Sequence, residues 1–282
     1  MKHTEYYQVA EHFFSVNSNY FFDNYAPFAV AKVNDTLFSL DVLQQPFTQL
    51  FTQELTQNDE GQTIVCGHLS NGEQVFEFWL EDNKAGVLIC NHDYKQNTLY
   101  INSGYERFAT DNALMIIFAL ATSKESTLLF HSSVIGYNGK AYMFLGKSGT
   151  GKSTHSRLWL NNIKGTFLLN DDNPAVRIFP DGIKVYGTPW SGKTECYINQ
   201  SLPLGAIVSL SQAKYNRITP LNSIMAYAAL VPSISGKRWD KAIADNLHAT
   251  ETAIIEKIKM WHLECLPDAD AAHLCQNAIS CN

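Results

Sequence analysis

The sequence predicts an α/β protein, α+β overall, with a β-rich N-terminal domain over residues 1–108 and a second domain over residues 109–282. Three observations support this prediction. Short apolar runs separated by turn residues fill the N-terminal region, which is typical of strands. A strand pattern, a glycine-rich loop and a helix pattern follow one another over residues 141–160. Apolar residues at helical spacing dominate the C-terminal region, so we expect terminal helices there.

Composition restricts the class of protein. The chain has 282 residues, of which 45% are hydrophobic, so a sizeable core can form. Its net charge is −6, which argues against a general nucleic-acid binder because such proteins usually carry a basic excess. The longest apolar run, over residues 113–121, is too short to span a bilayer. We therefore expect partners to include neither nucleic acid nor membrane.

The cysteines and the N-terminus indicate a reducing compartment. Six cysteines are present, and none forms C-x-x-C, so we expect no zinc ribbon and no redox motif. They are typical of reduced, mostly buried thiols. The first residues lack the apolar segment of a signal peptide. A cytoplasmic protein is the expectation.

In the N-terminal domain, the patterns predict strands and one hairpin. Asn71-Gly72 between two apolar runs is a strong hairpin signal. A helix is expected over residues 110–123, capped by Asp111 and Asn112 and opening the second domain. The predicted strands are residues 28–33, 36–42, 63–68, 74–80, 86–90 and 98–101.

The second domain alternates strand and helix patterns. A helix is expected after the glycine loop, over residues 154–160, and two more in the tail. One tail stripe joins Ala253, Ile254, Ile258 and Trp261, and the other runs from Ala271 to Ile279. Strands are expected over residues 128–135, 140–145, 166–169, 175–178, 183–186 and 205–210.

Residues 146–153 match G-x-x-x-x-G-K-[ST], the phosphate-binding loop of nucleotide enzymes. Glycines let the backbone curve around an anion and direct successive N–H groups toward it. Lys152 is expected to reach the outer phosphates, and the Ser153 hydroxyl to hold Mg²⁺. The expected nucleotide-binding residues of this loop are Gly146, Ser148, Gly149, Thr150, Gly151, Lys152, Ser153 and Thr154.

An acidic pair follows the next predicted strand. Asp171 and Asp172 come some twenty residues after the loop, where a carboxylate can meet Mg²⁺. We expect Asp171 to bind the metal and Asp172 to deprotonate a hydroxyl. Neighbouring side chains of a strand point to opposite faces, so both can serve only if the chain bends. The alternative is an exposed turn before Pro174.

Four further residues have both a functional and a structural interpretation. His131 lies on the strand before the loop and His155 in the first helical turn, and each is either a site residue or a packed one. Lys193, in a second glycine-bearing loop, can neutralise phosphate or remain a solvated surface lysine. Arg217 is a candidate transition-state cation or a surface residue.

Residues 131–172 resemble the HPr kinase/phosphorylase family and, more distantly, the ATP-type phosphoenolpyruvate carboxykinases. The resemblance rests on the loop, on the upstream His131 and on the Asp171–Asp172 pair. It implies a nucleotide-binding domain of that type, which binds ATP and Mg²⁺ and transfers phosphate to a serine hydroxyl. It also implies that His131 lies against the phosphates and that Arg217 contacts the transferring group. Related enzymes assemble, so a homo-oligomer is expected.

These observations lead to one expected function and two alternatives. We expect an ATP- and Mg²⁺-dependent phosphotransferase with a hydroxyl acceptor, which is a serine in a protein or peptide or a small molecule. The expected catalytic residues are Asp171, Asp172, His131, Lys152 and Arg217. A nucleotide-hydrolysing switch or scaffold and a non-catalytic nucleotide sensor remain open.

Overall fold

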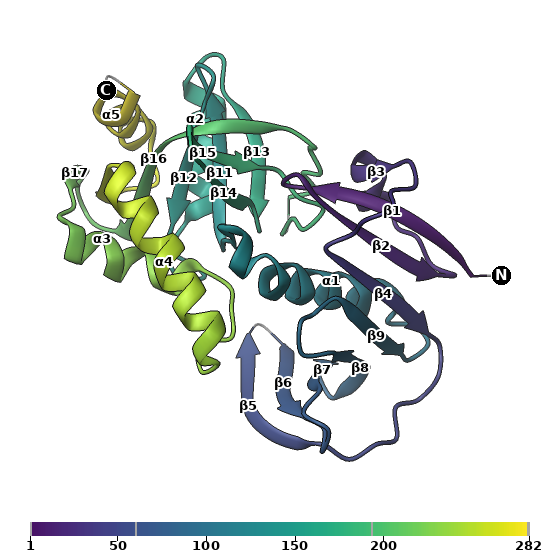
Figure 1. Cartoon of the computed structure of the whole chain (residues 1–282). Helices are drawn as coiled ribbons and strands as arrows, with labels where there is room; N and C mark the ends of the chain where they lie inside the picture. Colours follow the sequence, from purple (N-terminus) through teal and green to yellow (C-terminus); the bar gives the residue numbers. More distant parts are fainter. Residues whose placement is uncertain (1, 60, 193, 281–282) are drawn as a thin grey trace. The chain divides into compact units, whose positions relative to one another are not determined.

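The computed structural model describes residues 2–59, 61–192 and 194–280. It confirms a mixed α/β fold, with two sheets of nine strands and helices in the C-terminal part (Figure 1). The chain divides into two compact units, Met1–Thr122 and Ser123–Asn282. Within the described residues, no helix is both long enough and apolar enough to cross a bilayer.

The first unit is built on a sheet in the order β3-β1-β2-β4-β9-β8-β7-β6-β5. The hairpin predicted at Asn71-Gly72 is confirmed, since β6 and β7 pair antiparallel around a turn in which Gly72 has φ +86°. The sequence patterns missed β1, β2 and β5. The strands are β1 His3–Val9, β2 His12–Ser18, β3 Ala29–Val30, β4 Phe38–Leu43, β5 Thr52–Asp59, β6 Gln62–His68, β7 Gln74–Leu80, β8 Asn83–Cys90 and β9 Gln96–Ile101.

Helix α1 (Glu106–Ala121) belongs to this first unit, not to the second as the sequence suggested. Its apolar side packs on the sheet, and Gly86 of β8 permits the approach, because a Cβ there would lie 3.1 Å from the Cβ of Ala109. Asp111 is not a cap but an interior residue of the helix. Its carboxylate accepts hydrogen bonds from Tyr25 Oη (2.8 Å) and Asn24 Nδ2 (3.2 Å) of the same unit. Asp111 thus has tertiary partners within the unit, and the helix begins earlier, at Glu106.

In the second unit the strands follow the order β10-β14-β15-β16-β12-β11-β13, with β18 beside β16 and β17 beside β18. Strand β16 is parallel to both β12 and β18 and antiparallel to β15. The strands are β10 Thr127–Leu129, β11 Ser132–Tyr137, β12 Lys140–Leu145, β13 Phe167–Asp172, β14 Ala175–Phe179, β15 Gly182–Tyr186, β16 Ser201–Gln212, β17 Arg217–Pro220 and β18 Met260–Cys265. The helices are α2 Lys152–Asn162, α3 Ser223–Leu230, α4 Lys241–Lys257 and α5 Ala269–Ser280.

The single strand predicted over residues 128–135 is interrupted at Phe130 and His131. There the backbone pairs with another segment: Phe130 forms a bridge with Ile234, and the His131 N–H donates to the Ser233 carbonyl at 2.6 Å. Because the strand is interrupted here, the His131 side chain does not follow the alternating side-chain directions of a strand. The interruption lets the imidazole turn toward the end of the sheet, where β12 and β13 also end.

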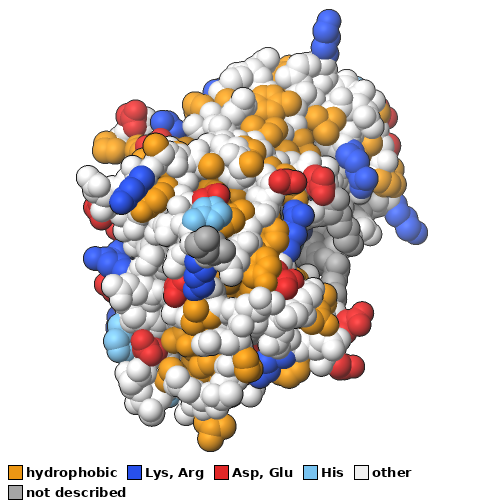
Figure 2. All heavy atoms as spheres, turned by 90° about the vertical axis from the view of Figure 1, so that its right-hand side faces the viewer, with side chains coloured by type: hydrophobic (Ala, Val, Ile, Leu, Met, Phe, Trp, Pro, Cys, Tyr) orange, Lys and Arg blue, Asp and Glu red, His pale blue; other side chains and the backbone are white. Residues whose placement is uncertain are grey.

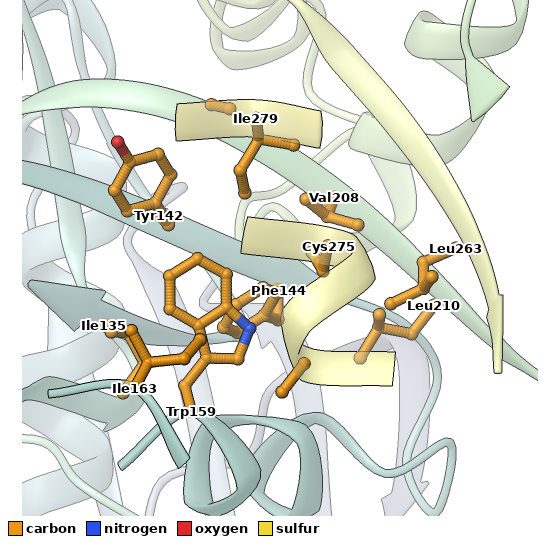
Figure 3. Close-up of a cluster of buried hydrophobic side chains, with 12 residues drawn as sticks. Ile135, Tyr142, Phe144, Trp159, Ile163, Val208, Leu210, Leu263, Cys275 and Ile279 are labelled. Atoms are coloured by element: carbon orange, nitrogen blue, oxygen red, sulfur yellow. The ribbon is translucent and has the colours of Figure 1, made fainter. Parts of the chain in front are cut away.

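Helices α2 and α5 contribute to one core with the strands of the second unit (Figure 3). Trp159 of α2 is completely buried against the rings of Tyr142 and Phe144 of β12. Cys275 and Ile279 of α5 belong to the same cluster. Burying one such large side chain stabilises a fold by roughly 1.5–3 kcal/mol. This core therefore holds the N-terminus of α2 firmly at the end of β12.

The sequence predicted one helix over the first tail stripe, and this prediction is wrong at its C-terminal end, at Trp261. Helix α4 stops at Lys257, and Trp261 lies on β18, where it pairs with Val208 of β16. Strand β18 pairs with β16 on one side and with β17 on the other, and this pairing places Trp261 in the sheet. The spacing of Trp261 from the preceding apolar residues also suits a helix. The second stripe is confirmed as α5.

Acidic and basic side chains are interspersed on the molecular surface drawn in Figure 2, with apolar groups between them. No block of one charge dominates that face.

Candidate functional site

A glycine-rich loop joins β12 to α2. Gly151 is the N-cap of α2 and has φ +107°, and Gly149 has φ +77°. These left-handed conformations are strained for residues with a Cβ, which explains why glycine occupies both positions. The first helical hydrogen bond runs from the His155 N–H to the Gly151 carbonyl at 2.8 Å. The N–H groups that precede it in a helix have no intrahelical acceptor and can bind an anion.

Three predicted site residues form one hydrogen-bonded chain at this loop. The Lys152 ammonium lies 2.9 Å from His131 Nε2 and 2.9 Å from the Gly146 carbonyl oxygen. His131 Nδ1 lies 2.9 Å from Asp172 Oδ1. An ammonium group only donates, so Nε2 accepts, and the imidazole proton on Nδ1 is donated to Asp172. The structure thus brings together residues from a β10–β11 connection, from α2 and from β13.

Asp172 receives a second hydrogen bond. Asn173 Nδ2 donates to its Oδ2 at 2.8 Å, so both carboxylate oxygens accept a hydrogen bond from a described residue. The His131 side chain is 44% exposed, and the chain of three therefore borders solvent. A ligand at the loop can reach it without rearrangement of the core.

Asp171 occupies a different environment. It lies opposite Ser133 of β11 and is only 6% exposed, and its Oδ1 has no hydrogen-bond partner among the described residues. Burial, and next the negative charge of Asp171, raise the pKa of the Cys196 thiol to about 11. A buried acceptor without a donor is uncommon in proteins. Its chemistry suits a cation or a hydroxyl that the described residues do not supply.

The second glycine-bearing loop packs against the aspartates. Ser191 forms a bridge with Asp172, and a Cβ on Gly192 would lie 3.1 Å from the Asp171 carbonyl oxygen. Asn170 fixes the loop, since its Nδ2 donates to Thr188 Oγ1 (3.1 Å) and to the Trp190 carbonyl (3.3 Å). Lys193, the predicted phosphate-binding residue of this loop, lies outside the described residues.

Arg217 is not part of this cluster. It lies on β17, where its Nε donates to Glu264 Oε2 at 2.8 Å and its guanidinium stacks 5.5 Å above the Tyr215 ring. Strands β11, β12, β16 and β18 separate β17 from β13. At a strand spacing of about 4.8 Å, the backbones are about 24 Å apart along the sheet, which exceeds the reach of an arginine side chain.

Two predicted metal ligands, Ser153 and Asp171, stay predictions. The described residues contain no group of three His, Cys, Asp or Glu side chains that could form a protein-only metal site. Mg²⁺ in nucleotide sites is usually held by one or two protein groups together with phosphates and water. The orphaned oxygen of Asp171 and a hydroxyl at the start of α2 fit that donor set.

Sequence reasoning missed several residues that shape the site. Asn173 and Asn170 hold Asp172 and the neighbouring loop, and their only signal was their position beside the aspartates. Gln212 of β16 donates from Nε2 to the Gly149 carbonyl at 3.1 Å, which ties the loop to the neighbouring strand. No local pattern could indicate this contact, because the partners are 63 positions apart in the sequence.

Comparison with known proteins adds a family. The family model described as SynChlorMet cassette protein ScmC matches residues 89–260, more than half of the chain. The chain belongs to this ScmC family. The matched part of this ScmC family member includes His131, the glycine loop, Asp171 and Asp172. No curated protein matches the chain.

Among solved structures, the chain is similar to the HPr(Ser) kinase/phosphatase from Coxiella burnetii. The match has 11% sequence identity and a TM-score of 0.32, and it covers 54% of this chain and 93% of the other.

Proposed function

We propose that this chain is an ATP- and Mg²⁺-dependent phosphotransferase that moves the γ-phosphate to a hydroxyl acceptor. The observation that carries the proposal is the hydrogen-bonded chain Lys152–His131–Asp172 at the glycine loop, next to Asp171, whose Oδ1 has no hydrogen-bond partner among the described residues. A cation, an anion cradle and two carboxylates in different environments are the parts that phosphoryl transfer requires.

The loop and Lys152 bind the donor. The amide groups at the start of α2 hold phosphate oxygens, and the ammonium of Lys152 exchanges its contact with the Gly146 carbonyl for a phosphate oxygen. Ser153 and Asp171 hold the Mg²⁺ that accompanies the nucleotide. When bound, this ion neutralises phosphate charge. Charge neutralisation and positioning then account for most of the catalysis.

Asp172 prepares the acceptor. The acceptor hydroxyl approaches this partly exposed carboxylate and gives up its proton to it, while the hydroxyl oxygen forms the new bond to the γ-phosphorus. The bond from the γ-phosphorus to the bridging oxygen breaks, and ADP leaves with that oxygen. His131 donates to Asp172 and so keeps the carboxylate in one orientation. The acceptor is a serine in a protein or peptide or a hydroxyl on a small molecule.

The test is calorimetric binding of Mg-ATP to the wild type, to Lys152→Ala and to Lys241→Ala. Lys241 is a matched control because its side chain is 87% exposed and its ammonium pairs with Asp245 of the same helix at 2.5 Å. We expect Lys152→Ala to lose at least tenfold in affinity and the control to bind like the wild type. Equal affinity of all three proteins contradicts the proposal.

Asp172→Asn then separates transfer from binding. The variant is expected to bind Mg-ATP within about threefold of the wild type and to lose phosphate transfer by about 10²–10⁴-fold. Release of inorganic phosphate without any acceptor would favour a hydrolysing switch, and binding without turnover would favour a sensor. Unchanged transfer in Asp172→Asn removes the base role.

A further inference from the structure

A pocket of about 310 Å³ opens beside the glycine loop, on the side away from the aspartates. Its walls come from three places: the loop with the first turns of α2, the end of β16, and the turn between β18 and α5. This volume lies within the range of small-molecule sites. In the sheet order, β13 with Asp171 and Asp172 lies on one side of β12, and β16 with β18 lies on the other.

The glycine loop therefore lies between the pocket and the acidic pair. A triphosphate held by the loop with its terminal phosphate toward β13 would extend its other end toward β16 and β18. The Gln212–Gly149 hydrogen bond joins the pocket wall directly to the loop. The pocket thus lies where the group attached to the α-phosphate would be.

The pocket walls suit a flat heterocycle. Leu158, Leu210, Leu266 and Pro267 contribute apolar surface from different elements. Such walls can enclose the two faces of a planar ring and remove it from water.

His155 contributes a hydrogen-bond donor without a partner. It lines the pocket and is 2% exposed, and its Nε2 accepts a hydrogen bond from Trp159 Nε1 at 3.1 Å. Because an indole N–H only donates, the imidazole proton lies on Nδ1. That Nδ1 is buried and has no hydrogen-bond partner among the described residues. A ring nitrogen or a carbonyl of a heterocyclic base is the acceptor that this position lacks.

We infer that this pocket binds the base and ribose of the nucleotide, with the neutral His155 donating to the base. The inference rests on the proposed function for the phosphate part of the ligand. It adds a nucleoside site that includes the β16 end, the β18–α5 turn and His155.

The experiment measures the affinity of Mg-ATP, Mg-tripolyphosphate and adenosine for the wild type, Ala213→Phe and Ala228→Phe. Ala213 lines the pocket, and its backbone N–H donates to the Cys265 carbonyl at 3.0 Å, a contact that does not involve its side chain, so a phenyl group can fill the space without removing a polar contact. Ala228 is an exposed residue of α3 and serves as the control. Thermal melting verifies that each variant is folded.

We expect the wild type to bind Mg-ATP at least tenfold more tightly than Mg-tripolyphosphate. In Ala213→Phe that advantage should disappear, with tripolyphosphate binding unchanged, and Ala228→Phe should behave like the wild type. A second variant, His155→Phe, keeps a ring against Phe144 and is expected to weaken Mg-ATP about tenfold while sparing tripolyphosphate.

Equal binding of Mg-ATP and Mg-tripolyphosphate to the wild type overturns the nucleoside pocket and leaves the phosphate site intact. An undiminished advantage in Ala213→Phe overturns it as well. If adenosine binds the wild type but not Ala213→Phe, the nucleoside pocket is supported. If tripolyphosphate fails to bind in the same experiment, only the phosphotransferase proposal is overturned. If none of the three ligands binds, both are overturned.

Discussion

Lys152 Nζ and His131 Nε2 share a hydrogen bond of 2.9 Å, which fixes the imidazole tautomer and directs its other proton to Asp172. The two residues are 21 positions apart and meet because β11 and β12 form a hairpin that starts and ends beside the glycine loop. In the proposed phosphotransferase, His131 thus joins Lys152, on the side of the phosphate donor, to Asp172, on the side of the acceptor.

Replacing His131 by Ala should therefore lower turnover more than nucleotide affinity. Without the imidazole, Asp172 loses a donor, and we expect kcat for transfer to fall about 100-fold, a typical cost of a misplaced catalytic group. Mg-ATP affinity should change by less than about threefold. His131→Gln should recover part of the activity, because its amide can donate and accept. His68→Ala, at a half-exposed histidine of the first unit, is the control. Equal kcat in both Ala variants contradicts this role.

Arg217→Ala should leave both Mg-ATP affinity and transfer rate within about twofold of the wild type. The sheet order separates β17 from β13, and the guanidinium is held by Glu264. Steady-state kinetics and calorimetry of the purified variant provide the measurement. A loss of transfer by a factor of ten or more would mean that Arg217 reaches the transferring phosphate in the working enzyme.

The Arg238–Glu251 ion pair should govern the stability of the second unit. Glu251 is completely buried, and its carboxylate accepts from Arg238 Nη2 at 2.6 Å and from Tyr227 Oη at 3.1 Å. Arg238→Met leaves that charge buried without its cation and should lower the free energy of unfolding by about 3–5 kcal/mol. Lys241→Met, in an exposed pair, should cost less than about 1 kcal/mol. Urea denaturation measures both, and equal midpoints would refute the expectation.

Stability should also depend on pH through His155. Burial lowers its pKa from 6.5 to about 4 in the folded protein. Between these values the unfolded chain binds the proton and the folded protein does not, so the free energy of unfolding decreases as the pH falls from about 6.5 to about 4. Above pH 6.5 the imidazole is neutral in both states, and this contribution is constant. Urea denaturation at several pH values should show a flatter profile for His155→Phe than for the wild type.

Local patterns were sufficient for several parts of the molecule. The glycine loop, β7, β12 and α5 lie where the sequence predicted them, because periodicity and turn residues act over short distances. The α/β class and the C-terminal helices followed from the same signals. The proximity of the loop and the acidic pair was also expected from their positions at strand ends.

Other features depend on contacts between residues far apart in the chain. In helix α1 Asp111 binds Tyr25 and Asn24 and does not cap the helix, and Trp261 joins a strand because β16 and β17 flank it. His131 faces Lys152 and Asp172 because the Ser233 segment interrupts its strand. Arg217 is remote because four strands intervene. The amino-acid sequence determined which chemical groups are available near the loop. Packing and sheet order decided which of these groups come into contact, because packing and sheet order depend on residues far apart in the chain.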